Sequence, residues 1–210
     1  MISTRILRVH PEETEPPALK EAAGVLLNSG LVAFPTETFY GLGASALDPG
    51  PLGRIYAVKG RSESKPLLVL VDSARMARTL VKEIPTVAWG LMTRYWPGPL
   101  TLVFKAVEGL PDALTAGTGT IGIRMPGHPV ALGLVRAAGV PVTAPSANPN
   151  GAEPPTTAEE VQRFFDGKIE LILDGGPTKG GLPSTILDVT ATPPRLIRQG
   201  ALDLSELDRR

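Results

Sequence analysis

Cysteine is absent from the sequence, and histidine occurs only at His10 and His128. Without cysteine the chain can form no disulfide, no thiolate zinc site and no catalytic thiol. Two histidines are also too few for a histidine metal cluster. We therefore predict no metal site made by protein side chains alone.

An excess of charge of one sign is lacking as well, because 21 Lys and Arg residues balance 21 Asp and Glu residues. A chain without net charge has no overall positive field to attract nucleic acid or acidic membranes. Any anion site must then be local.

Long apolar runs are missing too. No run approaches the roughly 18 apolar residues of a membrane span, and the first residues lack the apolar stretch of a signal peptide. We expect a cytoplasmic protein without a membrane-spanning segment.

The composition that remains suits a compact fold, since 42% of the 210 residues are hydrophobic and 20% are charged. Such a chain can bury a sizeable core, which excludes disorder and fibrous architectures. We predict a single domain spanning residues 1–210, without an internal repeat.

Segments with helical spacing alternate with short apolar or β-branched segments. Interleaved elements of this kind predict an α/β fold in which helices flank a sheet. The predicted helices are 18–29, 52–58, 86–95, 129–138 and 158–165, with another within 74–81. The predicted strands are 6–9, 31–34, 67–71, 100–105, 120–124, 140–144 and 169–173, with two more near 186–189 and 195–197.

Several connections between these elements are rich in Gly, Pro, Ser and Thr. Open α/β sheets commonly place ligand groups in loops that follow strands, although ordinary turns have the same composition. These loops are PTETFYGLG, VKGRSESKP, TAGTG, APSANPNGAEPPTT and DGGPTKGGLPST.

Two known phosphate-binding signatures do not apply. The segment GTGTIG at 117–122 has the G-x-G-x-x-G spelling, but it leads into a β-branched strand rather than the helix that a dinucleotide fold requires. The P-loop signature G-x-x-x-x-G-K-[ST] does not occur.

Lys59, Gly60 and Arg61 stand between a predicted helix and a predicted strand. The glycine lets both cations spread around one anion, and the pair suits a polyphosphate because arginine can bind two phosphate oxygens while lysine adds a mobile charge. The other interpretation is a helix end whose cations complement the helix dipole.

Ser146 and Asn148 follow the strand VPVTA in a loop that Pro145 and Pro149 restrict. The hydroxyl could donate to a phosphate oxygen, and the amide could both donate and accept. Equally, the two side chains could form turns that cap their own backbone.

Two arginines end apolar segments, Arg124 after TIGI and Arg198 after RLI. They could hold a carboxylate and a phosphate at the rim of a sheet, or they could form surface salt bridges worth under about 1 kcal/mol. Neutral donors and acceptors suited to a small polar ligand, or to buried loop backbone, occur at Thr36, Thr38, Tyr40, Ser184 and Thr185.

Catalytic bases are scarce. Glu37, Asp174 and Asp188 occur in loops or at strand ends without the spacing of an acid/base pair, and His128 is interpreted as a helix-start residue. A site rich in cations and hydroxyls would act on a nucleotide by orienting reactants and stabilising charge.

Taken together, the motifs resemble the YrdC-like family, and within it the short, single-domain threonylcarbamoyl-AMP synthases. The matching segments cover most of residues 20–200 in the family's order. They are FPTETFYGLG, KGR followed by KPLLVLV, YWPGPLTLVF, TIGIRMPGHP, APSANPNG and PSTILDV.

The resemblance implies a twisted, mostly open sheet flanked by helices, with a concave basic cavity. It also implies an enzyme that joins L-threonine, bicarbonate or CO2, and ATP into threonylcarbamoyl-adenylate and pyrophosphate. Mg²⁺ would be bound through the phosphates, and downstream transferase proteins would use the product to form N6-threonylcarbamoyladenosine in tRNA.

The resemblance also implies roles for single residues. The family's active-site motifs correspond to Lys59, Arg61, Ser146 and Asn148. Further nucleotide-contacting positions correspond to Lys65, Thr120 and Arg198, and the threonine-binding positions to Thr38, Arg124 and Ser184.

The sequence departs from the family pattern at four positions. Ser62 stands where proline is frequent, Lys65 where Asn or His is frequent, and Phe39 where Val is common. Leu70 occupies a position at which the long members carry a threonine-contacting histidine. We also expect no counterpart of the additional C-terminal domain of those long members.

Two other functions stay open. Double-stranded RNA binding is associated with this fold family, although zero net charge and 5% aromatic residues argue against strong affinity and leave at most weak RNA contact. The second is a module that handles carbamoyl-adenylate made from carbamoyl phosphate, although the acylphosphatase and zinc-finger segments that accompany such modules are missing.

Overall fold

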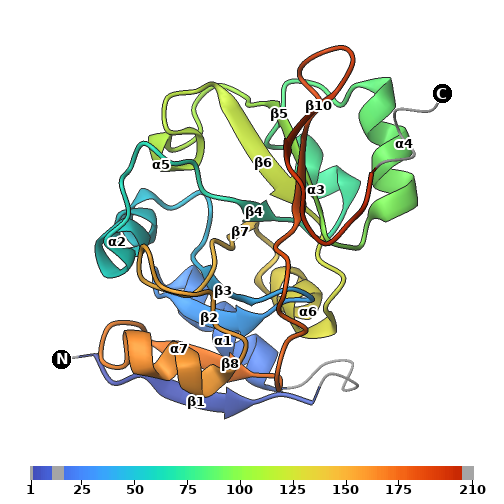
Figure 1. The fold of residues 1–210 in the computed structure, drawn as a ribbon. Coiled ribbons are helices and arrows are strands. Elements are labelled where there is room, and N and C mark those ends of the chain that lie inside the picture. The colour runs from blue at the N-terminus through green and yellow to red at the C-terminus, as the bar shows by residue number, and fades with distance from the viewer. Residues whose placement is uncertain (1, 11–16, 205–210) are drawn as a thin grey trace.

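The computed structural model describes residues 2–10 and 17–204 of the chain (Figure 1). The helices are α1 (Pro17–Leu27), α2 (Pro49–Lys59), α3 (Ala74–Arg78), α4 (Thr86–Tyr95), α5 (Asp112–Thr115), α6 (Pro129–Ala138) and α7 (Ala158–Phe165). The strands are β1 (Arg5–Arg8), β2 (Val32–Pro35), β3 (Tyr40–Gly43), β4 (Val69–Leu70), β5 (Leu100–Lys105), β6 (Thr120–Arg124), β7 (Val142–Thr143), β8 (Leu171–Asp174), β9 (Thr185–Asp188) and β10 (Arg195–Arg198).

The strands form two mixed sheets, which lie one above the other in the view of Figure 1. The smaller sheet has the order β1-β8-β2-β3, with β3 antiparallel to β2. The larger has the order β10-β9-β5-β6-β4-β7, in which β5 is parallel to β9 and β4 to β6. The predicted α/β class, with open sheets flanked by helices, is confirmed. The division into two sheets is what the sequence did not indicate.

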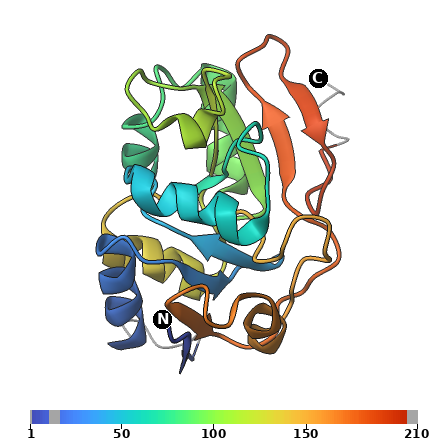
Figure 2. The ribbon, with the colours of Figure 1, turned by 90° about the vertical axis from the view of Figure 1, so that its left-hand side faces the viewer.

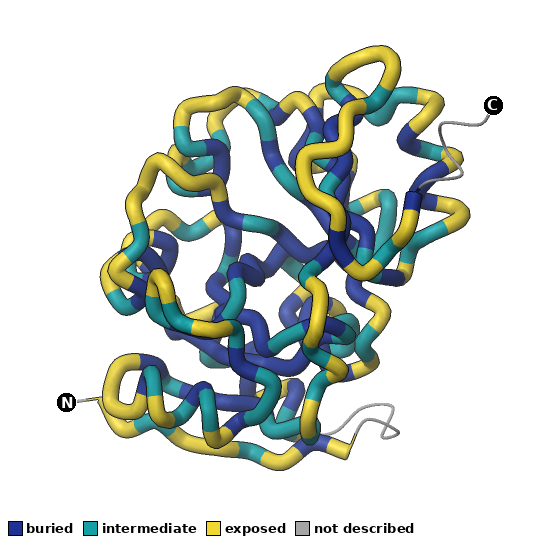
Figure 3. The backbone as a smooth tube through the Cα atoms, viewed as in Figure 1, coloured by how far each residue is buried: buried dark blue, intermediate teal, exposed yellow. Residues whose placement is uncertain are grey.

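Helices cover both faces of the smaller sheet at β2, which is apolar on both sides. In β2, Val32 and Phe34 pack with α1 and α6, whereas Ala33 belongs to the core cluster that contains residues of α2 and α7. Strand β2 is therefore buried throughout, and β8 is buried up to Asp174 (Figure 3).

The two sheets join where β3 lies beside the segment around β7. Gly41 forms an isolated bridge with Ser146, and Leu42 N–H donates to the Pro145 carbonyl at 2.8 Å. A Cβ at Gly43 would lie 2.7 Å from the Phe34 ring and 3.0 Å from Cγ1 of Val142. The close approach of β3 to β7 therefore requires glycine at position 43.

Two elements lie outside the predicted set. The strand β3 falls inside the loop PTETFYGLG, and the one-turn helix α5 falls in a stretch with no helical spacing. Among the described residues, no helix has the length and hydropathy needed to cross a membrane.

Three local predictions are confirmed. Helix α2 ends at Lys59, and Gly60 adopts the left-handed conformation with φ 58°, so the helix stops within the KGR motif. His128 is the N-cap of α6, and its Nδ1 accepts from the Val130 N–H at 3.2 Å. The GTGTIG segment leads into strand β6, which excludes the dinucleotide-binding arrangement.

The antiparallel pair β9 and β10 lies at one edge of the larger sheet (Figure 2). All four residues of β10 are exposed, while β9 is mostly buried against β5. This edge contributes side chains to the site described next.

Candidate functional site

A pocket of about 400 Å³ lies among strand ends and loops from both sheets. We call it the arginine pocket, because its lining includes Arg61, Arg124 and Arg198 and contains no carboxylate among the described residues. Its volume is in the range of small-molecule sites. A chain with zero formal net charge thus has a locally cationic cavity, as the sequence required of any anion site.

Of the ten residues predicted for the site, seven line the arginine pocket and three do not. Those in the lining are Thr38, Arg61, Thr120, Arg124, Ser146, Ser184 and Arg198. Outside the lining are Lys59, Asn148 and Lys65. The side chains of Lys59 and Asn148 are buried, and Lys65 is exposed.

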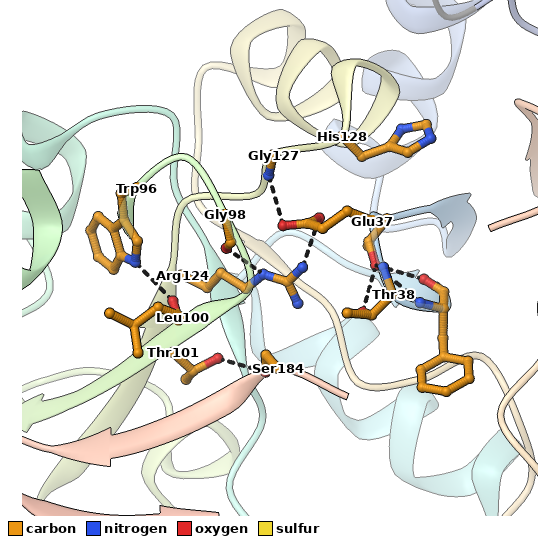
Figure 4. Close-up of polar contacts among 12 residues, drawn as sticks. Glu37, Thr38, Trp96, Gly98, Leu100, Thr101, Arg124, Gly127, His128 and Ser184 are labelled. Carbon is orange, nitrogen blue, oxygen red and sulfur yellow. Dashed lines mark hydrogen bonds and ion pairs between the residues drawn. The ribbon is translucent and has the colours of Figure 1, made fainter. Parts of the chain in front are cut away.

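Arg124, the last residue of β6, is 3% exposed and held from two sides (Figure 4). Its Nε donates to the Gly98 carbonyl at 3.1 Å, and its Nη2 forms an ion pair with Oε2 of Glu37 at 2.7 Å. Its Nη1 has no hydrogen-bond partner within residues 2–10 and 17–204. The guanidinium thus keeps one donor group for a ligand.

Glu37 is the carboxylate that balances Arg124. Its Oε1 accepts from the Gly127 N–H at 2.9 Å. Burial alone would raise the pKa of Glu37, but the charge of Arg124 and the hydrogen bonds outweigh it and lower the pKa below its ordinary value. The carboxylate is therefore ionised at neutral pH. Arg124 does not form the surface salt bridge that the sequence left open, because Arg124 is buried and Glu37 is only partly exposed.

The hydroxyl of Thr38 presents an acceptor to the arginine pocket. Oγ1 of Thr36 lies 2.7 Å from the Phe39 carbonyl oxygen, and only Thr36 can supply the proton for that contact. The proton in the 3.0 Å contact between the Thr36 and Thr38 hydroxyls must then come from Thr38. Only the lone pairs of Thr38 Oγ1 remain for a ligand.

Ser184 and Arg198 form another part of the lining. Arg198 donates from Nε and Nη2 to the Ser184 carbonyl, at 3.2 and 2.8 Å, and the Ser184 hydroxyl lies 2.9 Å from that of Thr101. Burial and the nearby charge of Arg124 lower the pKa of Arg198. Arg124 on β6 and Arg198 on β10 therefore both add positive charge to the arginine pocket.

Arg61 follows the end of α2 and also lines the arginine pocket, far in the sequence from Arg124 and Arg198. Its Nη2 donates to the Pro66 carbonyl at 3.0 Å, and its buried Nε has no hydrogen-bond partner in the part of the chain that is described. Ser146, also in the lining, has no side-chain hydrogen bond within the same part of the chain. These donors are available to a ligand.

Lys59 lies behind the lining and fixes the loop that carries Ser146. Its Nζ donates to the carbonyls of Ser146 and Asn148, both at 2.5 Å, and its own carbonyl accepts from the Asn150 N–H at 2.7 Å. Burial and the charge of Arg61 lower the pKa of Lys59 to about 8. Its side chain thus organises backbone in this structure.

Asn148 stabilises the same loop. Its Nδ2 donates to the carbonyls of Pro149 and Ala152, at 3.1 and 2.6 Å. Its buried Oδ1 accepts no hydrogen bond from the described residues. The amide nitrogen of Asn148 thus caps backbone carbonyls, as one of the two interpretations of the sequence proposed. Its oxygen has no donor among the described residues.

Metal ligands are sparse at the site. The described residues contain no group of three or more His, Asp or Glu side chains that could hold a metal ion. The lining of the arginine pocket offers hydroxyls and cations rather than the carboxylate oxygens that Mg²⁺ prefers.

Some lining residues were not predicted. Thr101 and Val103 extend from β5, and Ile186 and Ile197 from β9 and β10. The buried hydroxyl of Thr101 in an otherwise apolar strand is the one signal that sequence reading could have used. Phe39 was noted only as a departure from a family pattern, and it also lines the pocket.

Comparison with known proteins gives consistent matches. A family model named for Sua5, YciO and YrdC, and described as "Telomere recombination", matches residues 24–200. The threonylcarbamoyl-AMP synthase of Pyrococcus abyssi is 46% identical over 198 residues, or 94% of this chain and 58% of that protein. That of Halorhodospira halophila is 33% identical over 180 residues, or 85% of this chain and 93% of that protein.

A solved structure gives the same picture in three dimensions. The crystal structure of P. abyssi Sua5 complexed with L-threonine superposes with a TM-score of 0.93 and 45% identity. The match covers 98% of this chain and 60% of that one. This chain therefore spans less than two thirds of the P. abyssi protein.

Proposed function

This chain belongs to the family of the Sua5, YciO and YrdC proteins, and we propose that it is a threonylcarbamoyl-AMP synthase. The reaction joins L-threonine, bicarbonate or CO2, and ATP into threonylcarbamoyl-adenylate and pyrophosphate. The product would be used in the cytoplasm by downstream transferase proteins to modify adenosine in tRNA.

The observation that carries this proposal is the convergence of Arg61, Arg124 and Arg198 in one cavity. The three reactants or their derived groups are a carboxylate, a carbonate species and a triphosphate, which repel one another. Guanidinium groups fixed in a partly buried site offset that repulsion, and they need little rearrangement when the reactants arrive.

Threonine would bind beside Arg124. The free Nη1 group of Arg124 suits the α-carboxylate, and Oγ1 of Thr38 suits an N–H or O–H donor of the amino acid. An amine that donates one proton to Thr38 keeps its lone pair for carbon dioxide. Ser184 lines the same pocket and adds a hydroxyl that Arg198 and Thr101 hold in place.

The nucleotide would occupy the part of the arginine pocket lined by Arg61, Thr120, Ser146 and Arg198. Arg61 and Arg198 would bind phosphate oxygens. We assign Lys59 and Asn148 to the support of the Ser146 loop, from which the Lys59 charge still adds positive potential. Lys65 would contact the nucleotide only after a change of its exposed side chain.

The chemistry requires no side-chain nucleophile. The amine of threonine adds to carbon dioxide and loses a proton to give a carbamate. A carbamate oxygen then attacks the α-phosphorus of ATP, and the bond to the departing pyrophosphate breaks. The chain contributes orientation and charge stabilisation, which fits the absence of cysteine and the role of His128 as a helix cap.

Magnesium is proposed to bind through the phosphates of ATP alone. Among residues 2–10 and 17–204 the lining contains no carboxylate, so these residues offer the ion no ligand of the preferred kind there. The residues of the arginine pocket do not form a magnesium site, and we assign no step to the ion.

The test is mass analysis of the products formed from ATP, bicarbonate and L-threonine, with L-serine in a parallel reaction. Threonylcarbamoyl-adenylate and an equal amount of pyrophosphate are expected. Product only when carbamoyl phosphate replaces threonine and bicarbonate would favour the carbamoyl-adenylate alternative. A steep fall of RNA affinity with salt, in a chain that forms no adenylate, would favour RNA binding.

A further inference from the structure

We infer that Glu37 is a positioning residue, which orients the Arg124 guanidinium so that Nη1 meets the carboxylate of the amino-acid substrate. This inference rests on the proposed function, because it assigns the carboxylate of threonine to Arg124. None of the sequence motifs gave Glu37 this role.

The first argument concerns the three nitrogens of the Arg124 guanidinium and the partner that each one has. Nε of Arg124 is bound to the Gly98 carbonyl at 3.1 Å, and Nη2 is paired with Glu37 at 2.7 Å. The third nitrogen, Nη1, is the one left without a partner among the described residues, on a side chain that lines the arginine pocket. Two fixed edges determine the plane and direction of the third.

The second argument is that Glu37 does not itself reach a ligand. Its Oε2 is buried and lies 2.7 Å from the buried Nη2 of Arg124 as an ion pair, and Oε1 accepts from the Gly127 N–H at 2.9 Å (Figure 4). Glu37 is also absent from the lining of the arginine pocket. Its effect on a substrate must pass through Arg124.

The third argument is the frame around the pair. Gly98 N–H donates to the Met125 carbonyl at 2.9 Å, so the acceptor of Arg124 Nε is tied to the segment that follows Arg124. Glu37 is tied to Gly127 in that same segment. The loop before β3, which carries Thr38, and the loop after β6 are thereby held in one register around the guanidinium.

The substitution Glu37→Gln tests this arrangement with little change of shape. The carboxylate of Glu37 places one oxygen beside Arg124 and the other beside the Gly127 N–H. An amide has a single oxygen, so it can place an acceptor at only one of these two contacts. Its NH2 group would face a donor at the other contact. Arg124 then loses one of its two fixed edges.

Glu170 provides a matched control. Its Oε1 pairs with Nη2 of Arg54 at 2.8 Å, and its Oε2 accepts from the Leu31 N–H at 2.7 Å. These are the same two kinds of partner that Glu37 has, and neither Glu170 nor Arg54 lines the arginine pocket. Glu170→Gln therefore reports the cost of losing such a carboxylate away from the site.

The experiment measures threonine binding by calorimetry and the KM values for threonine and ATP in pyrophosphate release. For Glu37→Gln we expect KM and Kd for threonine to rise about tenfold or more, with KM for ATP within about twofold of the wild type. The preference for L-threonine over its carboxamide, measured as a competitor, should fall. For Glu170→Gln all these values should stay at wild-type level. If Glu37→Gln fails to fold, Glu37→Asp takes its place and should raise KM for threonine selectively.

Three results would overturn the inference. An unchanged KM for threonine in Glu37→Gln would do so, as would an equal rise in KM for threonine and ATP, and an undiminished preference for threonine over its carboxamide. A wild-type chain that binds threonine but forms no adenylate overturns the proposed function alone, and the binding constants of the variants then decide the role of Glu37. A wild-type chain that does not bind threonine overturns both.

Discussion

The ammonium group of Lys59 lies 2.5 Å from the carbonyl oxygen of Ser146, a residue 87 positions away in the sequence. The Lys59 side chain at the end of α2 thus binds a backbone carbonyl as well as supplying positive charge. The buried ammonium also donates to the Asn148 carbonyl. Loss of this side chain would leave two carbonyls of the same loop without their donor.

We expect Lys59→Ala to lower the rate of threonine-dependent pyrophosphate release about tenfold or more and also to lower the free energy of unfolding by about 1–3 kcal/mol, since buried acceptors lose their partner. Steady-state kinetics and urea denaturation measure the two effects. A variant with full activity would contradict the support role of Lys59.

Arg61→Ala should lower the same rate about tenfold or more with little change in stability, because Arg61 is only partly buried and donates to one loop carbonyl. Arg54→Ala is the control, since Arg54 lies in α2, the helix that Arg61 follows, but outside the arginine pocket. Equal rates for the two variants would remove Arg61 from the proposed phosphate site.

The lowered pKa of Lys59, about 8, makes a specific prediction for stability. In the unfolded chain the pKa of lysine is about 10.4, so between about pH 8 and pH 10 the unfolded state keeps a proton that the folded state releases. The contribution of Lys59 to the free energy of unfolding is lowest at a pH where its ammonium is charged in both the folded and the unfolded chain. This contribution increases as the pH rises through the window. The free energy of unfolding of the wild type should therefore increase relative to that of Lys59→Met, as followed by urea titrations across the window. Parallel pH profiles for the two chains would show that the pKa is not lowered.

Thr38→Val should raise KM for threonine about tenfold, because it removes the only lone pairs that the Thr36–Thr38 hydroxyl pair offers to the pocket. Thr38→Ser keeps the hydroxyl and should stay within about threefold of the wild type. Steady-state kinetics with varied threonine compare the two. A KM for threonine near the wild-type value in Thr38→Val would contradict the role of the hydroxyl.

Gly43→Ala should destabilise the chain by about 1–3 kcal/mol, because its methyl group would overlap the Phe34 ring where the two sheets join. The control is Gly53→Ala in the exposed part of α2, where a Cβ meets nothing within 4 Å. That change should stabilise the helix by about 0.5–1 kcal/mol. Denaturant unfolding gives both values, and a neutral Gly43→Ala would contradict the close approach of β3 and β7.

The elements that the sequence predicted well are those with a strong local pattern. Strands β5 and β6 are runs of apolar and β-branched residues, and α6 has helical spacing between a proline at its start and Gly139 at its end. The strand β3 was missed because YGLG has two glycines and no clear alternation. Its formation depends on pairing with β2, which local sequence does not encode.

Several members of the candidate site were predictable from the sequence, but its geometry was not. Arg124, Arg198 and Thr38 were singled out and do line one pocket. The direction of a side chain, however, depends on partners far along the chain. Lys59 donates to carbonyls near position 147, and Glu37 pairs with Arg124, which lies far along the chain. Such pairings leave no trace in spacing or composition.

The lining of the arginine pocket draws on residues from Thr36 to Arg198, and therefore on strands and loops of both sheets. A cavity assembled in this way disappears when the sheets separate, because no contiguous stretch of sequence retains it. Reactants that fill it bind the native state and not the unfolded one, so by mass action they oppose denaturation in proportion to the logarithm of their concentration. Bound reactants would then stabilise the folded chain against unfolding.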